Sequence, residues 1–229
     1  MMLRSINKKK IYFYLLVLFF LSTSLNLNII STLKSSNLVK NIEIKGIEGK
    51  EKQLLSEELK QFKNQNIFII DKNQIFKILN LFNFIDYFYI KKILPSKLIV
   101  SVKKTEFFGL TIIDGKKYYV GKNKKFISVT KVEHEKDLPL IFGNFKPSEF
   151  LDLQKKLEQE NINLLNIKKY YFHKNKRWDF KDDKKIVMLP QENVNQALKL
   201  YKSLIDENKL NLIKIVDLRI PNKIILTDE

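Results

Sequence analysis

The sequence predicts an α+β protein that a single N-terminal helix holds in a membrane. Residues 11–30 are mostly apolar and uncharged, the following part combines strand and helix patterns, and the remainder is rich in short strand patterns. We therefore divide the chain into a cytoplasmic tail (1–10), a transmembrane anchor (11–31), a linker (32–37), an α+β domain (38–106) and a mainly β domain with flanking helices (107–229).

The anchor prediction rests on length, composition and flanking charge. About 20 mostly apolar residues in a helix cross the ~30 Å hydrocarbon core of a bilayer. The ten residues before this segment carry Arg4, Lys8, Lys9 and Lys10 and no acid. Because such a basic flank holds the N-terminus in the cytoplasm, we expect a single-pass membrane protein with an extracytoplasmic body.

The same segment also has features of a cleavable secretory signal, whose apolar core is shorter than a transmembrane span. Its purely apolar run covers only Ile11 to Leu21, and the small polar residues after it make a cut near Ser24 conceivable. No Ala-x-Ala pattern stands there, and apolar residues recur as far as Ile30. We therefore expect an uncleaved anchor, which a mature N-terminus near Ser24 would contradict.

Cysteine content and charge exclude several functional classes. The 229 residues include no cysteine, which excludes disulfides, thiolate metal sites and a cysteine nucleophile. The net charge of +17 would suit a polyanionic partner such as nucleic acid. Only three of the 42 basic residues are arginine, however. Nucleic-acid-binding proteins recognise phosphates and bases largely through bidentate arginine contacts. We interpret the dispersed lysines as solvated surface and expect no nucleic-acid partner.

The first domain reads as strand, helix, helix, strand, strand. Apolar residues alternate in its strands and recur at helical spacing in its helices, and Asp71 is a suitable N-cap for the second helix. The expected elements are a strand at 38–49, helices at 50–62 and 71–82, and strands at 87–93 and 97–106. Two amphipathic helices over a three-stranded sheet would bury these apolar faces.

This order, directly after a single anchor, resembles a POTRA domain. The matching residues are I-E-I-K-G at 42–46 and P-x-x-L-x-V-x-V at 95–102. In POTRA domains the hairpin usually continues into a Glu, a Pro and an Ala, whereas Lys104, Phe107 and Gly109 stand in those places here. The hairpin motif therefore matches only in part.

The second domain is predicted to consist of short strands and two helices. The expected strands lie on either side of Asp114-Gly115, at 126–127, 167–172, 177–180 and 185–189, and there is an apolar turn at 138–143. Helices are expected from Pro147 and at 194–205, and two short strands bent at Pro221-Asn222 end the chain. We expect Trp178 to pack in the core of the sheet, with an exposed anchoring role as the alternative.

Several stretches of this domain resemble the FtsQ/DivIB family of bacterial cell-division proteins. They are L-P-L-I-F-G at 138–143, K-R-W-D-F at 176–180, K-I-V-M-L-P at 185–190 and I-V-D-L-R-I-P-N-K at 215–223, of which V-D-L-R is the most specific. The resemblance implies a non-enzymatic division (divisome) scaffold of the inner membrane, enriched at the septum, that links early and late division proteins. It also implies single-span partners of the FtsB and FtsL type, bound by the C-terminal strands.

The residues themselves show no catalytic constellation. His134 lies between two glutamates and His173 lies in a lysine-rich turn. His134 with Glu133 and Glu135 only imitates a metal site, because adjacent loop residues rarely converge on one ion. The sequence also contains no glycine-rich phosphate loop or nucleophile elbow. We expect no catalytic, cofactor or metal site and no small-molecule substrate.

The expected partner site lies at the end of the chain. The strand from Lys223 to Leu226 is last in the sequence, and an edge strand there would offer unpaired N–H and C=O groups to a partner strand. The resemblance places partner binding on Arg177, Arg219, Ile220, Lys223, Ile224, Ile225 and Leu226. For each arginine the alternative is a bidentate ion pair within the sheet.

Two other functions fit parts of the sequence. A POTRA-bearing outer-membrane assembly or secretion factor normally carries repeated POTRA domains and a long β-barrel, for which 229 residues leave no room. A periplasmic hydrolase would need a catalytic constellation that we do not find in the sequence. The division scaffold is therefore the function that we expect.

Overall fold

The N-terminal helix stands apart from the rest of the described chain. The structure is a computed structural model that describes residues 8–23, 37–133, 137–182, 184–210 and 212–228. Helix α1 (Lys8–Thr23) exposes every apolar side chain from Ile11 to Leu21, on all of its faces. Among the described residues, no helix is both long enough and apolar enough to cross a membrane. Residues 24–31 of the predicted anchor lie outside the described part of the chain.

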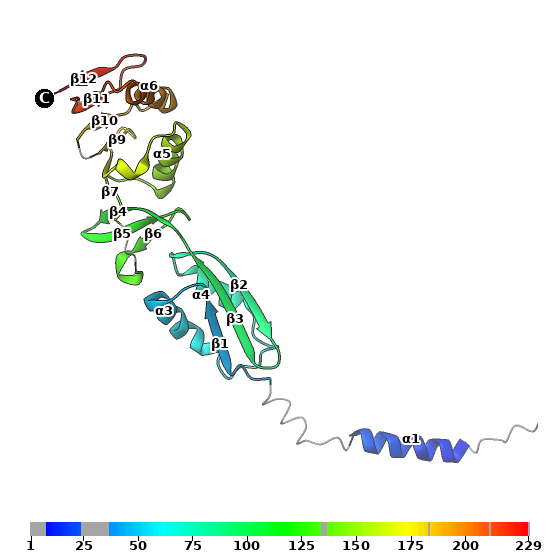
Figure 1. The fold of residues 1–229 in the computed structure, drawn as a ribbon. Helices are drawn as coiled ribbons and strands as arrows, with labels where there is room; N and C mark the ends of the chain where they lie inside the picture. Colours follow the sequence, from blue (N-terminus) through cyan, green and yellow to red (C-terminus); the bar gives the residue numbers. More distant parts are fainter. Residues whose placement is uncertain (1–7, 24–36, 134–136, 183, 211, 229) are drawn as a thin grey trace, which may run out of the picture.

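The first domain is a three-stranded sheet with two helices packed against it (Figure 1). Its elements are β1 (Asn41–Lys45), α3 (Gly49–Leu59), the short helix η1 (Lys60–Phe62), α4 (Lys72–Asn80), β2 (Ile85–Ile93) and β3 (Lys97–Lys104). The strand order is β1-β3-β2, with β1 parallel and β2 antiparallel to β3. The strands and helices therefore follow one another in the order that the sequence predicts.

Local chemistry explains where these elements begin and end. The side chain of Asp71 accepts a hydrogen bond of 2.9 Å from the backbone N–H of Asn73, which confirms it as the N-cap of α4. Gly46 follows β1 with a φ of 86°, and a Cβ atom there would lie 2.1 Å from the carbonyl oxygen of Val102. Only glycine fits both the backbone conformation and this close approach.

The second domain is a nine-stranded sheet with α5 (Pro147–Gln159) and α6 (Val194–Asp206) packed against it. Its strands are β4 (Phe107–Ile113), β5 (Lys116–Gly121), β6 (Phe126–Ser128), β7 (Leu140–Phe142), β8 (Lys169–Phe172), β9 (Trp178–Lys181), β10 (Ile186–Met188), β11 (Ile215–Asp217) and β12 (Ile225–Thr227). Their order is β12-β11-β10-β9-β8-β7-β4-β5-β6. Short 3₁₀ turns, η2 (Val129–Lys131) and η3 (Leu164–Asn166), lie between strands and helices.

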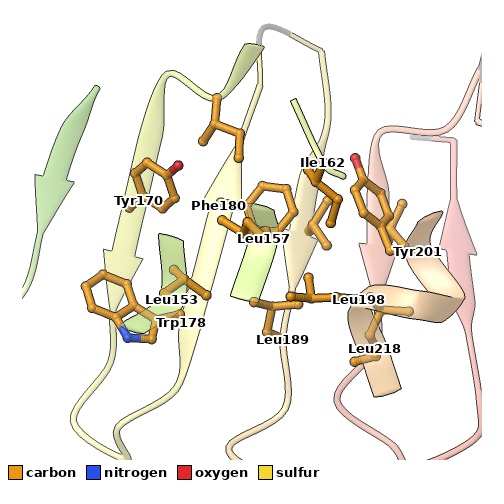
Figure 2. Packing of buried hydrophobic residues seen from close by; sticks show 14 of the residues in the cluster. Leu153, Leu157, Ile162, Tyr170, Trp178, Phe180, Leu189, Leu198, Tyr201 and Leu218 are labelled. Atoms are coloured by element: carbon orange, nitrogen blue, oxygen red, sulfur yellow. The ribbon is translucent and has the colours of Figure 1, made fainter. Parts of the chain in front are cut away.

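One face of this sheet forms a continuous hydrophobic core with both helices (Figure 2). Phe180 of β9 is paired in register with Tyr170 and Val187 on the neighbouring strands, and all three side chains are buried. Leu157 of α5 and Leu198 of α6 pack in the same cluster. Because cross-strand partners share a face, the residues on either side of this row in each strand must point to the opposite face.

Trp178 belongs to the same core. Its indole ring lies 4.7 Å from the ring of Phe172 and 5.6 Å from that of Phe145, measured between ring centroids. Phe150 of α5 packs on it from the helix side at 5.8 Å. The expectation that this tryptophan packs in the core is therefore confirmed.

Polar contacts join the two domains. The buried carboxylate of Glu51 on α3 accepts hydrogen bonds from the ammonium of Lys104 and, at 3.1 Å, from the backbone N–H of Glu133. Burial raises the pKa of Glu51, but these hydrogen bonds outweigh it, so the pKa lies below its ordinary value. Asn83 donates to the carbonyl oxygen of Phe126 at 3.1 Å. This last contact places the first domain against β6, which is one edge of the nine-stranded sheet.

Candidate partner-binding site

The last strand is an open edge of the nine-stranded sheet. Among the described residues, β12 pairs only with β11, in the antiparallel register Val216–Leu226 and Asp217–Ile225. Ile225 and Leu226 are each 39% exposed. The opposite edge, β6, differs because Asn83 already occupies the carbonyl of Phe126. Of the two edges, β12 is therefore the one better suited to accept another strand.

The predicted start of this last strand was wrong by two residues and its predicted end by one. The strand was expected from Lys223, whereas β12 begins at Ile225. A turn precedes it, in which the N–H of Lys223 donates to the carbonyl of Ile220 at 3.2 Å. Pro221 fixes the first central position of this turn, and Asn222 takes the positive φ of 58° that the second requires. Lys223 closes this turn and therefore lies outside the strand.

One of the predicted site residues, Ile224, holds this turn and strand to the body. Ile224 packs partly buried against the main hydrophobic core, while Ile220 is exposed. The turn is also tied to α6, because the side chain of Gln196 donates to the side-chain oxygen of Asn222 at 2.6 Å. Ile224 thus has a packing role, and Ile220 remains available at the surface.

Arg219 pairs with Asp217 on the strand next to the edge. Its Nε donates to Oδ1 at 2.8 Å and its Nη2 donates to Oδ2 at 2.5 Å, while its backbone N–H also reaches Oδ1 at 3.0 Å. These hydrogen bonds hold the pKa of Asp217 below its ordinary value. The Arg219 side chain is 46% exposed, so one side of this bidentate pair faces solvent.

Arg177 makes a more buried version of the same pair. Its Nε and Nη2 each donate to a carboxylate oxygen of Asp179 at 3.2 Å, and its side chain is 17% exposed. His173 lies 2.7 Å from the same carboxylate. The buried carboxylate of Asp179 therefore organises two surrounding side chains.

Strand register places the two pairs on one face of the sheet. Met188 of β10 is the cross-strand partner of Asp179 on one side and of Asp217 on the other, and Asp217 in turn faces Ile225 of β12. These four residues define the outer row, which alternates along each strand with the buried row beneath the helices. Arg177 also lowers the pKa of Asp217, so the two ion pairs lie within electrostatic reach.

Comparison with protein families identifies this domain. Residues 111–219 match the model of the cell division protein FtsQ/DivIB, C-terminal. The second domain therefore belongs to the FtsQ/DivIB family. No curated protein matches the chain. The matched region contains both aspartate–arginine pairs, and β12 follows immediately after it.

Membership of the FtsQ/DivIB family gives the chain a role in cell division and confirms the family resemblance seen in the sequence. The family consists of non-enzymatic division proteins. Its members act with other divisome proteins, so a protein-binding surface is the kind of site to expect.

The candidate site also contains residues that the sequence does not mark as unusual. Arg177 and Arg219 were identified as unusual, but their partners Asp179 and Asp217 were not. A signal was available in the two-residue spacing of each pair, because side chains two apart on extended backbone point to the same face. In the structure Arg177 directly precedes β9, and Arg219 follows β11. The position of Met188 between the pairs could not be found this way, since it depends on strand register.

The described residues contain no group of three His, Cys, Asp or Glu side chains that could hold a metal ion. His134, considered as a metal ligand in the sequence, lies outside the described residues. His173 is engaged with Asp179.

Proposed function

We propose that this FtsQ/DivIB chain is a non-enzymatic scaffold of the divisome that binds single-span partners of the FtsB and FtsL type. The observation that carries the proposal is the open edge of β12, which pairs on one side only among the described residues. A partner segment in extended conformation would add to this edge through backbone hydrogen bonds. Ile225 and Leu226 would supply apolar contacts on opposite faces of the enlarged sheet.

We also propose that the chain is held in the inner membrane with its N-terminus in the cytoplasm. The exposure of apolar side chains on all faces of α1 supports this, since such a helix needs an apolar environment. The basic residues that precede it support the orientation. The first domain, whose element order resembles a POTRA domain, would then lie between the membrane and the partner-binding domain.

Depletion of the protein in its own cells tests the division role directly. We expect filamentous, undivided cells on depletion, and we expect a fluorescent fusion of the full chain to collect at mid-cell. Normal division after complete depletion would contradict the scaffold proposal. Recovery of the chain in the outer-membrane fraction would contradict the proposed location.

Arg219→Glu is expected to weaken partner capture without unfolding the domain. The substitution replaces an exposed cation with an anion beside Asp217, so it repels both this carboxylate and any acidic group on the partner. The affinity for an FtsB-type partner should fall about five- to thirty-fold, corresponding to about 1–2 kcal/mol. Co-purification at several salt concentrations measures this change.

The matched control is Lys117→Glu, which makes the same charge change on β5, an inner strand near the β6 edge of the sheet. It should leave capture unchanged. If Arg219→Glu and Lys117→Glu weaken capture equally, only net charge is involved. If neither does, Arg219 is not at the interface.

A further inference from the structure

Three large apolar side chains are exposed at one end of the first domain. Phe68 and Ile69, in the loop before α4, are 60% and 79% exposed. Leu94, in the turn between β2 and β3, is 57% exposed. Nothing in the described chain covers them, although residues of this size are normally placed where they can be buried. We call Phe68, Ile69 and Leu94 the apolar tip.

Backbone hydrogen bonds bring these two loops to the place where the chain enters the domain. The N–H of Ile67 donates to the carbonyl of Asn37 at 2.9 Å, and the N–H of Lys40 donates to the carbonyl of Ser96 at 2.9 Å. The ammonium of Lys92 donates to the carbonyl of Ile70 at 2.6 Å. Figure 1 shows the start of β1 and the β2–β3 turn at the same end of the sheet. The apolar tip therefore surrounds the entry of the chain from α1.

The charge around this entry is mostly positive. Lys40, Lys63 and Lys91 are exposed on the segments that form this end. The acidic residues there are Asp71, which caps α4, and Glu43, which is paired with Lys45 and Lys97. Exposed apolar side chains ringed by lysines are the composition of a surface that inserts between anionic lipid headgroups. A protein partner would not require the lysines, whereas an anionic bilayer attracts them.

The length of the chain before the tip argues for the same occupant. If the proposed anchor ends near residue 31, six peptide steps reach Asn37, which is about 20 Å at full extension. Such a short tether keeps the tip at a high effective concentration beside the bilayer, so even weak contacts become populated. The tip is thus the part of the domain that the membrane surface meets first.

We propose that the apolar tip docks on the surface of an anionic lipid bilayer and gives the first domain a second membrane contact beside the anchor. Phe68, Ile69 and Leu94 would enter the headgroup region, and the surrounding lysines would face lipid phosphates. The contact would fix the direction in which the body extends from the membrane. This inference rests on the proposed membrane anchor, and the test separates the two.

The full chain allows a direct test because it contains no cysteine. Single substitutions Ile69→Cys and Leu94→Cys receive an environment-sensitive fluorophore, and the chain is reconstituted into phosphatidylglycerol vesicles that carry nitroxide-labelled lipids. Both positions are exposed, so the fold should tolerate the change. We expect a blue shift of emission and quenching by the lipid nitroxide at both positions.

Labels at two reference positions distinguish a failure of the tip proposal from a failure of the anchor proposal. Leu165, in the second domain, is 84% exposed. A label on Leu165→Cys should show the emission of an aqueous environment and no quenching by the lipid nitroxide. Leu16→Cys lies in α1, and its label should be quenched by the bilayer. Quenching at Leu16 without quenching at Ile69 and Leu94 would overturn the tip proposal and leave the anchor standing. Absence of quenching at Leu16 would overturn the anchor, and the inference would fall with it.

Lipid charge gives the final comparison. In phosphatidylcholine vesicles the quenching at Ile69 should decrease, because the lysines then lose their anionic partners. The double substitution Phe68→Ser and Ile69→Ser should reduce quenching of a label at Leu94 in anionic vesicles. Equal quenching in both lipids would overturn the preference for an anionic surface, and unchanged quenching in the double variant would overturn the role of the two apolar side chains.

Discussion

Asp179→Ala is expected to lower the free energy of unfolding by about 3–5 kcal/mol, the cost typical of breaking a buried ion pair from one side. The carboxylate of Asp179 accepts two hydrogen bonds from Arg177 and lies 2.7 Å from His173. Without it, the guanidinium of Arg177 is left mostly buried with its donors unpaired. Denaturant unfolding of the full chain, followed by the fluorescence of the single tryptophan, measures the change.

The double substitution Arg177→Met with Asp179→Ala serves as the control. It removes both charges together, so the loss of stability should be clearly smaller than for Asp179→Ala alone. His173 is more exposed and can turn its ring to water. A loss below about 1 kcal/mol for Asp179→Ala, together with weaker partner capture, would show that the cluster serves the interface and not the fold.

The local pattern of the sequence was sufficient to predict most elements of the fold. Apolar spacing located α4 and α6, and Asp71 correctly marked a helix start. The strand order was beyond such patterns, because β1 pairs with β3 across more than fifty intervening positions and in parallel. The hydrogen bond from the N–H of Glu133 to Glu51 joins residues 82 positions apart. The apolar spacing within a segment does not indicate which distant segment it contacts.

For the candidate site, too, the sequence identifies the residues but does not show how they are placed. Arg177 and Arg219 were identified because arginine is scarce in this chain, and their intramolecular pairing was the stated alternative. The structure shows that pairing for both arginines, but it leaves Arg219 half exposed and Arg177 mostly buried. The scarcity of arginine in the sequence cannot show which of the two arginines is more exposed, because their exposure depends on how β9, β10 and β11 are arranged.

A proline at one of two adjacent positions in β12 is expected to abolish most partner capture while the domain stays folded. In an antiparallel pair, neighbouring residues alternate between directing their N–H to the paired strand and directing it outward. Leu226 and Ile225 are such neighbours, opposite Val216 and Asp217. Proline at the outward position removes the donor that a partner strand would use. Affinity for an FtsB-type partner should then fall roughly ten- to one-hundred-fold.

The two substitutions Ile225→Pro and Leu226→Pro therefore form an internal control. Proline at the position whose N–H points to β11 should break the ladder between β11 and β12 and lower stability. Proline at the position whose N–H points outward should lose binding with little change in stability. Ile225→Thr and Leu226→Thr keep the backbone donor and the strand preference, so they should bind better than the corresponding prolines. Normal capture by folded forms of both proline variants would rule out strand addition at β12, because no outward donor of this edge would then be required.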